Sequence, residues 1–192
     1  MYKIIDNFLE QDLFDNLKTL LLSTEFPWFF QENISVVGNE SNNTLLNFGF
    51  SHVFFKDGYI NSNLFDTIRP ILDALSIETN CQYLLKARAD LTVYSKDTHV
   101  HQIHKDLFED HVTAILYITE TSAETVLYKN ISNHKTPSEL NTYISKNKDS
   151  FEILTTIKPK ENRLVYFNGK LLHTGHSPSD RKNRILLNFN LI

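Results

Sequence analysis

Residues 162–192 read NRLVYFNGKLLHTGHSPSDRKNRILLNFNLI, and this stretch decides the fold class. Apolar and polar residues alternate in its last segment, ILLNFNLI, as they do in a strand with one buried face. The turn-forming segment GHSPSD separates this strand from the apolar segment KLLHTGH. The C-terminal part of the chain therefore consists of short strands joined by polar turns.

The same character extends back to about residue 82. Polar turns separate further short segments of β type, which are YLLKARADLTVYS, HVTAILYIT, ETVLYKN and FEILTTIKP. Several short strands without helices between them predict a sandwich or a barrel. Residues 129–150 interrupt the strands, and we expect this insertion to be partly helical.

The N-terminal part, about residues 1–80, has a different pattern. In residues 10–26 apolar residues follow the spacing of three and four that marks one face of a helix. A second helix is expected over 61–79, with Asn61 or Ser62 as its cap. Residues 31–44 are polar and predict a loop. No linker separates the two parts, so residues 1–192 form one α+β, mainly β domain, with N-terminal helices packed on a β body at about 82–192.

Composition excludes several classes of protein. The net charge of −4 argues against sequence-blind binding to nucleic acid, which needs an excess of Lys and Arg. The single cysteine, Cys81, excludes an internal disulfide and fits a reducing cytosol. No secretory signal and no membrane span is expected from the apolar pattern. We therefore expect a cytoplasmic protein, and the richness in Asn, Lys and Ile fits an AT-rich source such as a phage in its host. The oligomeric state cannot be read from the sequence.

Four of the eight histidines lie in the segment HVHQIHKDLFEDH, residues 99–111. His104 and Asp106 are two residues apart, so on a strand their side chains would point to the same side and could bind one metal ion. His173, in the segment KLLHTGH, can supply a third ligand. Two histidines and one carboxylate form the facial triad that binds Fe(II) and leaves other positions open.

Arg184 begins the last strand, eleven residues after His173. A turn around GHSPSD would let the two strands run side by side, with Arg184 next to the metal. Its planar, permanently charged guanidinium matches a carboxylate. Arg181 is a second candidate for this role, but it lies in a polar turn, whereas Arg184 begins a regular alternation.

These residues resemble the Fe(II)/2-oxoglutarate-dependent oxygenases, in particular the prolyl-4-hydroxylase-like branch with its small phage and bacterial members. The resemblance covers about residues 83–192 and rests on HKD at 104–106, on His173, on Arg184 and on HVTAILYITETSAETVLY at 111–128. It implies a double-stranded β-helix, or jelly-roll, whose open mouth holds the metal. Ala123 departs from the pattern, because relatives often carry glycine there.

The resemblance also implies a reaction and its cofactors. Fe(II) would be held by the metal ligands His104, Asp106 and His173, and the far carboxylate of the cosubstrate 2-oxoglutarate by Arg184. Tyr94 and Tyr117 are further candidates for cosubstrate binding, although tyrosines on strands are also common in a core. The enzyme would use O2, with ascorbate as an accessory reductant, and would release succinate and CO2. The hydroxylated substrate would be a small molecule or a protein side chain, by default a prolyl residue.

Other interpretations stay open at this point. His99, His101 and His104 could instead form the site of a non-redox, zinc-dependent hydrolase or of a cupin-like metal-binding module. A β-sandwich module that binds a ligand without turnover is a third hypothesis. Arg88 either faces the pocket or forms a surface ion pair, and His176 lies in the turn after His173. Substrate selection is expected in the 31–44 loop and the 129–150 insertion.

Overall fold

The computed structural model describes residues 2–34, 45–147 and 150–192. Its helices and strands follow one another as β1 (Tyr2–Ile5), α1 (Gln11–Leu22), β2 (Phe29–Gln31), β3 (Gly49–Lys56), β4 (Tyr59–Ile60), the 3-10 helix η1 (Phe65–Ile68), α2 (Arg69–Thr79), β5 (Leu84–Val93), β6 (Val112–Tyr117), β7 (Thr125–Ile131), α3 (Pro137–Asn147), β8 (Ile153–Ile157), β9 (Arg163–Asn168), β10 (Leu171–Gly175) and β11 (Asn183–Leu191). Most of the β structure lies after residue 83, as the sequence predicts.

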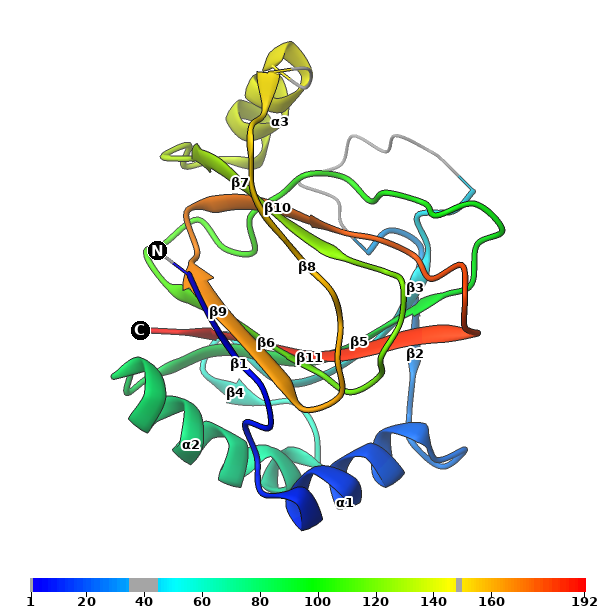
Figure 1. The fold of residues 1–192 in the computed structure, drawn as a ribbon. Helices are drawn as coiled ribbons and strands as arrows, with labels where there is room; N and C mark the ends of the chain where they lie inside the picture. Colours follow the sequence, from blue (N-terminus) through cyan, green and yellow to red (C-terminus); the bar gives the residue numbers. More distant parts are fainter. Residues whose placement is uncertain (1, 35–44, 148–149) are drawn as a thin grey trace.

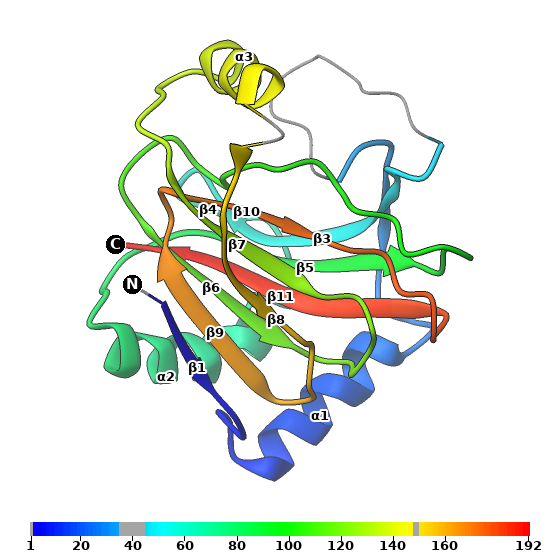
Figure 2. The ribbon, with the colours of Figure 1, turned by 45° about the horizontal axis from the view of Figure 1, so that its top comes forward.

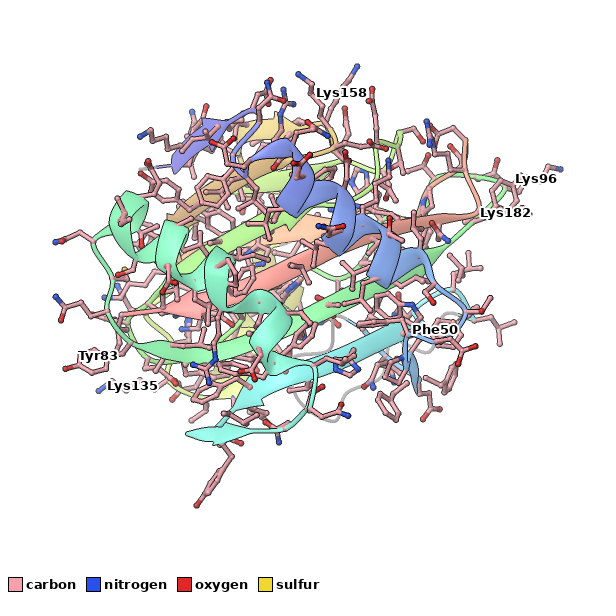
Figure 3. The ribbon with its side chains drawn as sticks, turned by 90° about the horizontal axis from the view of Figure 1, so that it is seen from below. Phe50, Tyr83, Lys96, Lys135, Lys158 and Lys182 are labelled. Carbon is pink, nitrogen blue, oxygen red and sulfur yellow. The ribbon has the colours of Figure 1, made fainter. Side chains whose placement is uncertain are left out.

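Two antiparallel sheets form a double-stranded β-helix (Figures 1 and 2). The larger sheet has the order β1-β9-β6-β11-β5-β3-β2, with β4 paired to β3, and the smaller sheet has the order β10-β7-β8. Helices α1 and α2 lie across the outer face of the larger sheet, as the view onto these helices shows (Figure 3). Helix α3 lies beside the smaller sheet, on the opposite side of the molecule (Figure 1). The predicted jelly-roll with N-terminal helices packed on it is confirmed.

Alternation along the central strands sends side chains into two separate cores. On β11, Ile185, Leu187 and Phe189 pack against the helices, whereas Leu186 packs in the space between the two sheets. Strand β6 divides in the same way, with Leu116 toward the helices and its neighbours toward the other sheet. Because side chains on a strand point alternately to opposite faces, one apolar strand can serve both cores. The second core, between the sheets, is where the polar side chains of the candidate site also lie.

The helices differ in detail from their predicted bounds. Helix α1 ends at Leu22, and the predicted helix over 61–79 divides into η1 and α2. Pro70 stands in the first turn of α2, where its missing N–H costs nothing, and the Ser62 hydroxyl accepts from the Leu64 N–H before η1. The 129–150 insertion contains α3, and most of the predicted 31–44 loop, residues 35–44, lies outside the described residues. No helix in the described ranges is long and apolar enough to span a membrane.

The predicted pairing of the strands around His173 and Arg184 is wrong. Strand β10 pairs with β7 in the smaller sheet, whereas β11 lies between β5 and β6 in the larger one. The segment between them is not a tight hairpin, because the Ser177 N–H donates to the His99 carbonyl and the chain crosses from one sheet to the other. His173 and Arg184 therefore reach the interior from opposite sheets.

Replacing Phe189 with alanine tests the core under the helices. Phe189 is 0% exposed, so Phe189→Ala leaves a cavity between β11 and the helices, and we expect the free energy of unfolding in urea to fall by about 3–5 kcal/mol. Ile77 on α2 is 87% exposed, and Ile77→Ala should change the free energy of unfolding by less than about 0.5 kcal/mol. Equal losses in the two variants would contradict this description of the core.

Candidate metal centre

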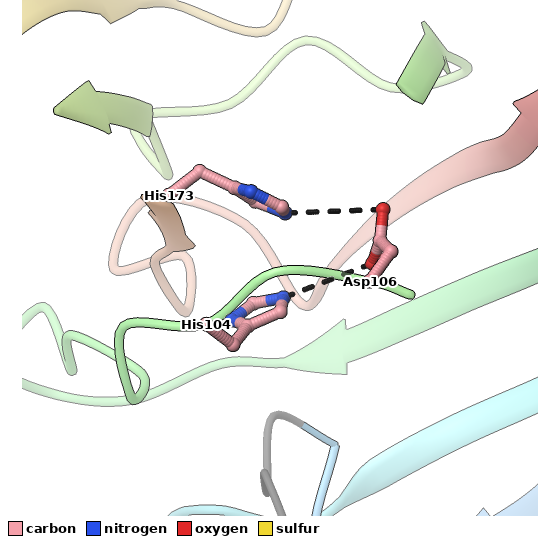
Figure 4. Close-up of side chains that lie close together, drawn as sticks. All are labelled: His104, Asp106 and His173. Carbon is pink, nitrogen blue, oxygen red and sulfur yellow. Dashed lines mark ion pairs between the residues drawn. The ribbon is translucent and has the colours of Figure 1, made fainter. Parts of the chain in front are cut away.

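His104, Asp106 and His173 meet in the interior of the β-helix (Figure 4). The Asp106 carboxylate lies with Oδ1 4.0 Å from His104 Nε2 and Oδ2 3.9 Å from His173 Nε2. One ligand atom of each residue lies within 4.8 Å of the others. In the described ranges this is the only group of three or more metal-ligating side chains that lie this close together. The fold thus brings His173 to His104 and Asp106, although it lies 69 and 67 residues after them in the sequence.

A single β-bridge, rather than a strand, holds the two histidines together. The sequence predicts that residues 99–111 contain a strand, and this prediction is wrong, because the segment has only isolated bridges from Val100 to His176 and from His104 to His173. The backbone N–H of each of His104 and His173 donates to the carbonyl of the other, at 2.9 Å in both directions. This pair of bonds anchors an irregular segment to β10 and fixes the spacing of the two imidazoles.

Backbone carbonyls orient both rings. His104 Nδ1 lies 2.8 Å from the Gln102 carbonyl oxygen, and His173 Nδ1 lies 3.2 Å from that of Leu171. A carbonyl can only accept, so each Nδ1 carries the proton in the neutral ring. Each Nε2 then points its lone pair toward Asp106, which is the arrangement that a metal ion requires.

The protonation states also suit a metal. Burial lowers the pKa of His104 to about 4 and lowers that of His173 as well, so both rings are neutral at pH 7. Burial opposes ionisation of Asp106, but the pKa of its carboxyl lies well below the usual range, and the permanent positive charge of Arg88, with Nη2 3.9 Å from Oδ1, favours the ionised form. Two neutral imidazoles and a carboxylate bind a divalent ion without first releasing protons.

Three donors hold one oxygen of Asp106. Oδ2 accepts from Thr113 Oγ1 at 3.2 Å, Asn188 Nδ2 at 3.2 Å and Asn190 Nδ2 at 3.1 Å. The side chain of Asp106 is 3% exposed, so these bonds replace the water that it loses on burial. The sequence analysis did not predict this set of donors. Two of them could have been noticed as asparagines at interior-facing positions of the otherwise apolar segment LLNFNL.

A pocket adjoins the candidate ligands, and His104 and His173 line it. Strands β5, β10 and β11 supply most of its wall, and its polar lining residues are Arg88, Asp90, Thr92, His101, His104, Thr125, His173, Thr174, Arg184 and Asn188. Apolar side chains, among them Ile115 and Leu186, complete the wall. The pocket therefore combines an apolar surface with convergent polar groups, as ligand sites commonly do.

Arg184 lies buried in this pocket without an anion. It is 5% exposed, its Nη2 donates to Thr125 Oγ1 at 2.6 Å, and its Nε has no hydrogen-bond partner. Within the described ranges no carboxylate lies within ion-pair distance of it. The buried Thr92 hydroxyl, on the strand paired with Arg184, also lacks a partner. A buried guanidinium is costly unless a negative group balances it, so an anionic ligand would suit this end of the pocket.

The two predicted tyrosines lie in different places. Tyr117 is fully buried, and its hydroxyl donates to Thr125 Oγ1 at 2.7 Å, beside the contact that Arg184 makes. Tyr94 follows the end of β5 and is 52% exposed, where it lines a separate surface hollow with Arg181 and Lys182. The structure thus brings Tyr117 to the surroundings of Arg184 and does not bring Tyr94 to the pocket.

The other histidines and Arg88 also have defined positions. His99 Nε2 lies 2.8 Å from Asn47 Oδ1, and His101 Nε2 lies 3.0 Å from Ser177 Oγ, so neither is gathered with His104. His101 nevertheless lines the pocket, while half-buried His176 lines a different hollow. Arg88 faces the pocket, with its Nε 2.8 Å from Asp90 Oδ2.

Comparisons with known proteins agree with the fold. Residues 105–184 match the family described as "Family of unknown function (DUF6445)". No curated protein sequence matches the chain. Similar solved structures include the non-heme alpha ketoglutarate dependent epimerase SnoN from nogalamycin biosynthesis, with a TM-score of 0.67 and 11% identity over 100% of this chain and 78% of that one.

Two further solved structures are similar. The Pseudomonas putida prolyl-4-hydroxylase has a TM-score of 0.58 and 14% identity over 99% of this chain and 91% of its own. HygX from Streptomyces hygroscopicus, with nickel and 2-oxoglutarate bound, has a TM-score of 0.60 and 12% identity over 99% of this chain and 82% of its own. At these identities the likeness establishes a shared fold, and it does not single out the prolyl-4-hydroxylase-like branch. Fold and site together define a double-stranded β-helix with a candidate two-histidine, one-carboxylate centre.

Removing a donor to Asp106 should weaken metal binding. In Asn190→Ala or Thr113→Val the carboxylate loses one of the bonds that orient it, and we expect the affinity for Mn(II) in calorimetric titration to fall roughly 10- to 100-fold. Asn63→Ala, at an exposed position, is the control and should bind as the unaltered protein does. Unchanged affinity in both donor variants, with folding intact, would show that these bonds do not support the centre.

The metal-free protein should lose stability in mild acid. Folding lowers the pKa of His104 from 6.5 to about 4 and that of His101 to about 3, so the unfolded chain binds more protons than the folded one between about pH 4 and 6.5. The stabilisation is fully present above pH 6.5, and the His104 share, roughly 3 kcal/mol, is lost as the pH falls toward 4. Urea unfolding at pH 7.5, 6 and 5 measures the free energy of unfolding at each pH. If this free energy falls with pH as steeply in His104→Gln as in the unaltered protein, the loss does not come from His104.

Proposed function

We propose that the protein is an Fe(II)- and 2-oxoglutarate-dependent dioxygenase. One observation carries the proposal: His104 and His173, which are gathered with Asp106, line the same pocket as Arg184, a buried cation that has no carboxylate partner in the described ranges. The first feature suits a divalent ion with open positions, and the second suits a dicarboxylic acid that reaches the same ion. Two proteins of similar fold support this reading, namely the alpha ketoglutarate dependent epimerase SnoN and HygX, whose structure has nickel and 2-oxoglutarate bound.

The metal would be held by His104 Nε2, His173 Nε2 and one oxygen of Asp106. Both imidazoles are neutral, and Asp106 is fixed through Oδ2 by three donors, so the ligands need little rearrangement. No thiolate takes part, which suits a site that meets oxygen. The iron, the cosubstrate and O2 supply the oxidising chemistry when bound, and the chain supplies binding and orientation.

The far carboxylate of 2-oxoglutarate would pair with Arg184. Thr125 already accepts a hydrogen bond from Arg184, and the unpartnered Thr92 hydroxyl can donate to the same carboxylate. Tyr117 supports the set through its bond to Thr125, so we assign it an indirect role. Ile115 and Leu186 exclude water from the space between the two ends. Tyr94 stays a prediction from the resemblance, because its exposed side chain does not line this pocket.

We propose hydroxylation, with release of succinate and CO2, as the outcome of the reaction. The substrate would be a small molecule or a protein side chain, and ascorbate would act as an accessory reductant. The alternative of a zinc hydrolase or cupin-like module built on His99 and His101 has no support, since their ring nitrogens bind Asn47 and Ser177 and are not gathered with His104. Cytoplasmic location and phage origin stay predictions from composition.

Anaerobic titration and a turnover assay test the proposal together. Fe(II) and 2-oxoglutarate should produce the visible charge-transfer absorption of a chelated 2-oxo acid, and admission of oxygen should release succinate. Arg184→Gln should weaken 2-oxoglutarate binding by about 30-fold or more, because a buried charge pair loses one partner, and Arg184→Lys should recover part of the loss. His173→Ala should remove both signals.

Arg181→Gln is the matched control, because Arg181 is exposed outside the pocket, and it should behave as the unaltered protein does. Activity that requires zinc, ignores 2-oxoglutarate and survives Asp106→Ala would refute the proposal.

A further inference from the structure

We propose that Arg88 binds a carboxylate of the substrate, and that the substrate is therefore a small carboxylic acid rather than a prolyl residue within a chain. This inference rests on the proposed function, because it places the substrate in the same pocket.

Strand β5 presents a polar face to the pocket. Its odd-numbered residues, Ala87 and Ala89, are fully buried against the helical core, and the alternate positions carry Arg88, Asp90 and Thr92, which line the pocket. An apolar residue at 88 or 90 would complete the core between the sheets at lower cost, because buried ion pairs are seldom more stable than the apolar residues that could replace them. A charged pair at this place therefore suggests a role in binding.

Arg88 pairs with Asp90 without being locked by it. Asp90 Oδ2 lies 2.8 Å from Arg88 Nε, but this ion pair lacks hydrogen-bond geometry, and Arg88 Nη2 lies 3.9 Å from Asp106 Oδ1, beyond hydrogen-bond distance. The side chain of Arg88 is 21% exposed and lines the pocket. The planar fork of such a guanidinium can still bind a carboxylate.

Arg88 and Arg184 serve different ends of the pocket. In the pairing of β5 with β11, Arg184 lies opposite Thr92 and Arg88 lies opposite Asn188. Four residues along a strand separate the two positions by about 13 Å. Asn188 donates to Asp106, so Arg88 lies at the end of the pocket near the metal ligands, away from the far carboxylate of 2-oxoglutarate.

The position of Arg88 also limits where such a substrate would react. Because Arg88 Nη2 lies only 3.9 Å from Asp106 Oδ1, a carboxylate paired with Arg88 places the carbons next to it beside the metal ligands. The expected substrates are small acids, amino acids among them, that are oxidised within a few bonds of the carboxylate. A prolyl residue inside a peptide has no free carboxylate to offer.

Ligand binding can be measured without turnover. The protein is loaded anaerobically with Mn(II) and 2-oxoglutarate, and paramagnetic broadening of probe protons is followed by NMR. The probes are the twenty free L-amino acids and the straight-chain monocarboxylic acids of three to six carbons, each beside its carboxamide. We expect at least one acid to bind about tenfold more tightly than its amide or better.

The double variant Arg88→Gln/Asp90→Asn removes both charges and leaves neither buried alone. It should bind that acid about tenfold more weakly and should bind its amide and 2-oxoglutarate unchanged. Arg88→Lys keeps a positive charge and replaces the double variant if that variant does not fold. It should retain part of the preference for the acid over its amide. Arg181→Gln is the exposed control and should retain all of it.

The outcomes separate the two proposals. If no acid is preferred over its amide, or if the preference survives in the double variant, Arg88 does not bind a substrate carboxylate. A tenfold loss of 2-oxoglutarate affinity in the double variant would instead assign Arg88 to the cosubstrate and would also overturn the inference. Failure of the unaltered protein to bind Mn(II) or 2-oxoglutarate would refute the dioxygenase proposal itself.

Discussion

Burial of the Asp106 carboxylate is the constraint on which the site depends. The carboxylate is 3% exposed, so it loses its hydrogen bonds to water and needs others from the protein. Thr113, Asn188 and Asn190 supply three hydrogen bonds to one of its oxygens. These donors come from β6 and β11, at the centre of the larger sheet, so the sheet must carry polar side chains where a core would otherwise be apolar. In the described ranges the other oxygen accepts no hydrogen bond of this kind, and a divalent ion would complete its surroundings.

Much of the fold could be predicted because alternation is a local property. The segments ILLNFNLI and ARADLTVY show which residues face the helices and which face the interior, and the structure follows that division. The pairing of strands in a sheet could not be predicted in the same way. Alternation does not say which strand lies beside which, so the predicted pairing of the strands at His173 and Arg184 failed, although both side chains still reach the interior from opposite sheets.

The candidate site shows the same limit. The spacing of His104 and Asp106 picked out residues that do lie close together, but for a partly wrong reason, since a bridge to His173 rather than a strand holds them. Tyr94 shares the parity of Thr92, but β5 ends at Val93 and the chain leaves the sheet before its side chain could enter the pocket. The sequence left open whether Arg88 faces the pocket or forms a surface ion pair, and its contact with Asp90 depends on side-chain geometry that no local pattern contains.

A crystal structure of the protein soaked anaerobically with Mn(II) and 2-oxoglutarate tests the central claim most directly. The account predicts one Mn(II) ion bonded to His104 Nε2, His173 Nε2 and an oxygen of Asp106, with the far carboxylate of 2-oxoglutarate paired to Arg184. An ion bound instead by His99 and His101, or 2-oxoglutarate lying away from Arg184, would contradict it.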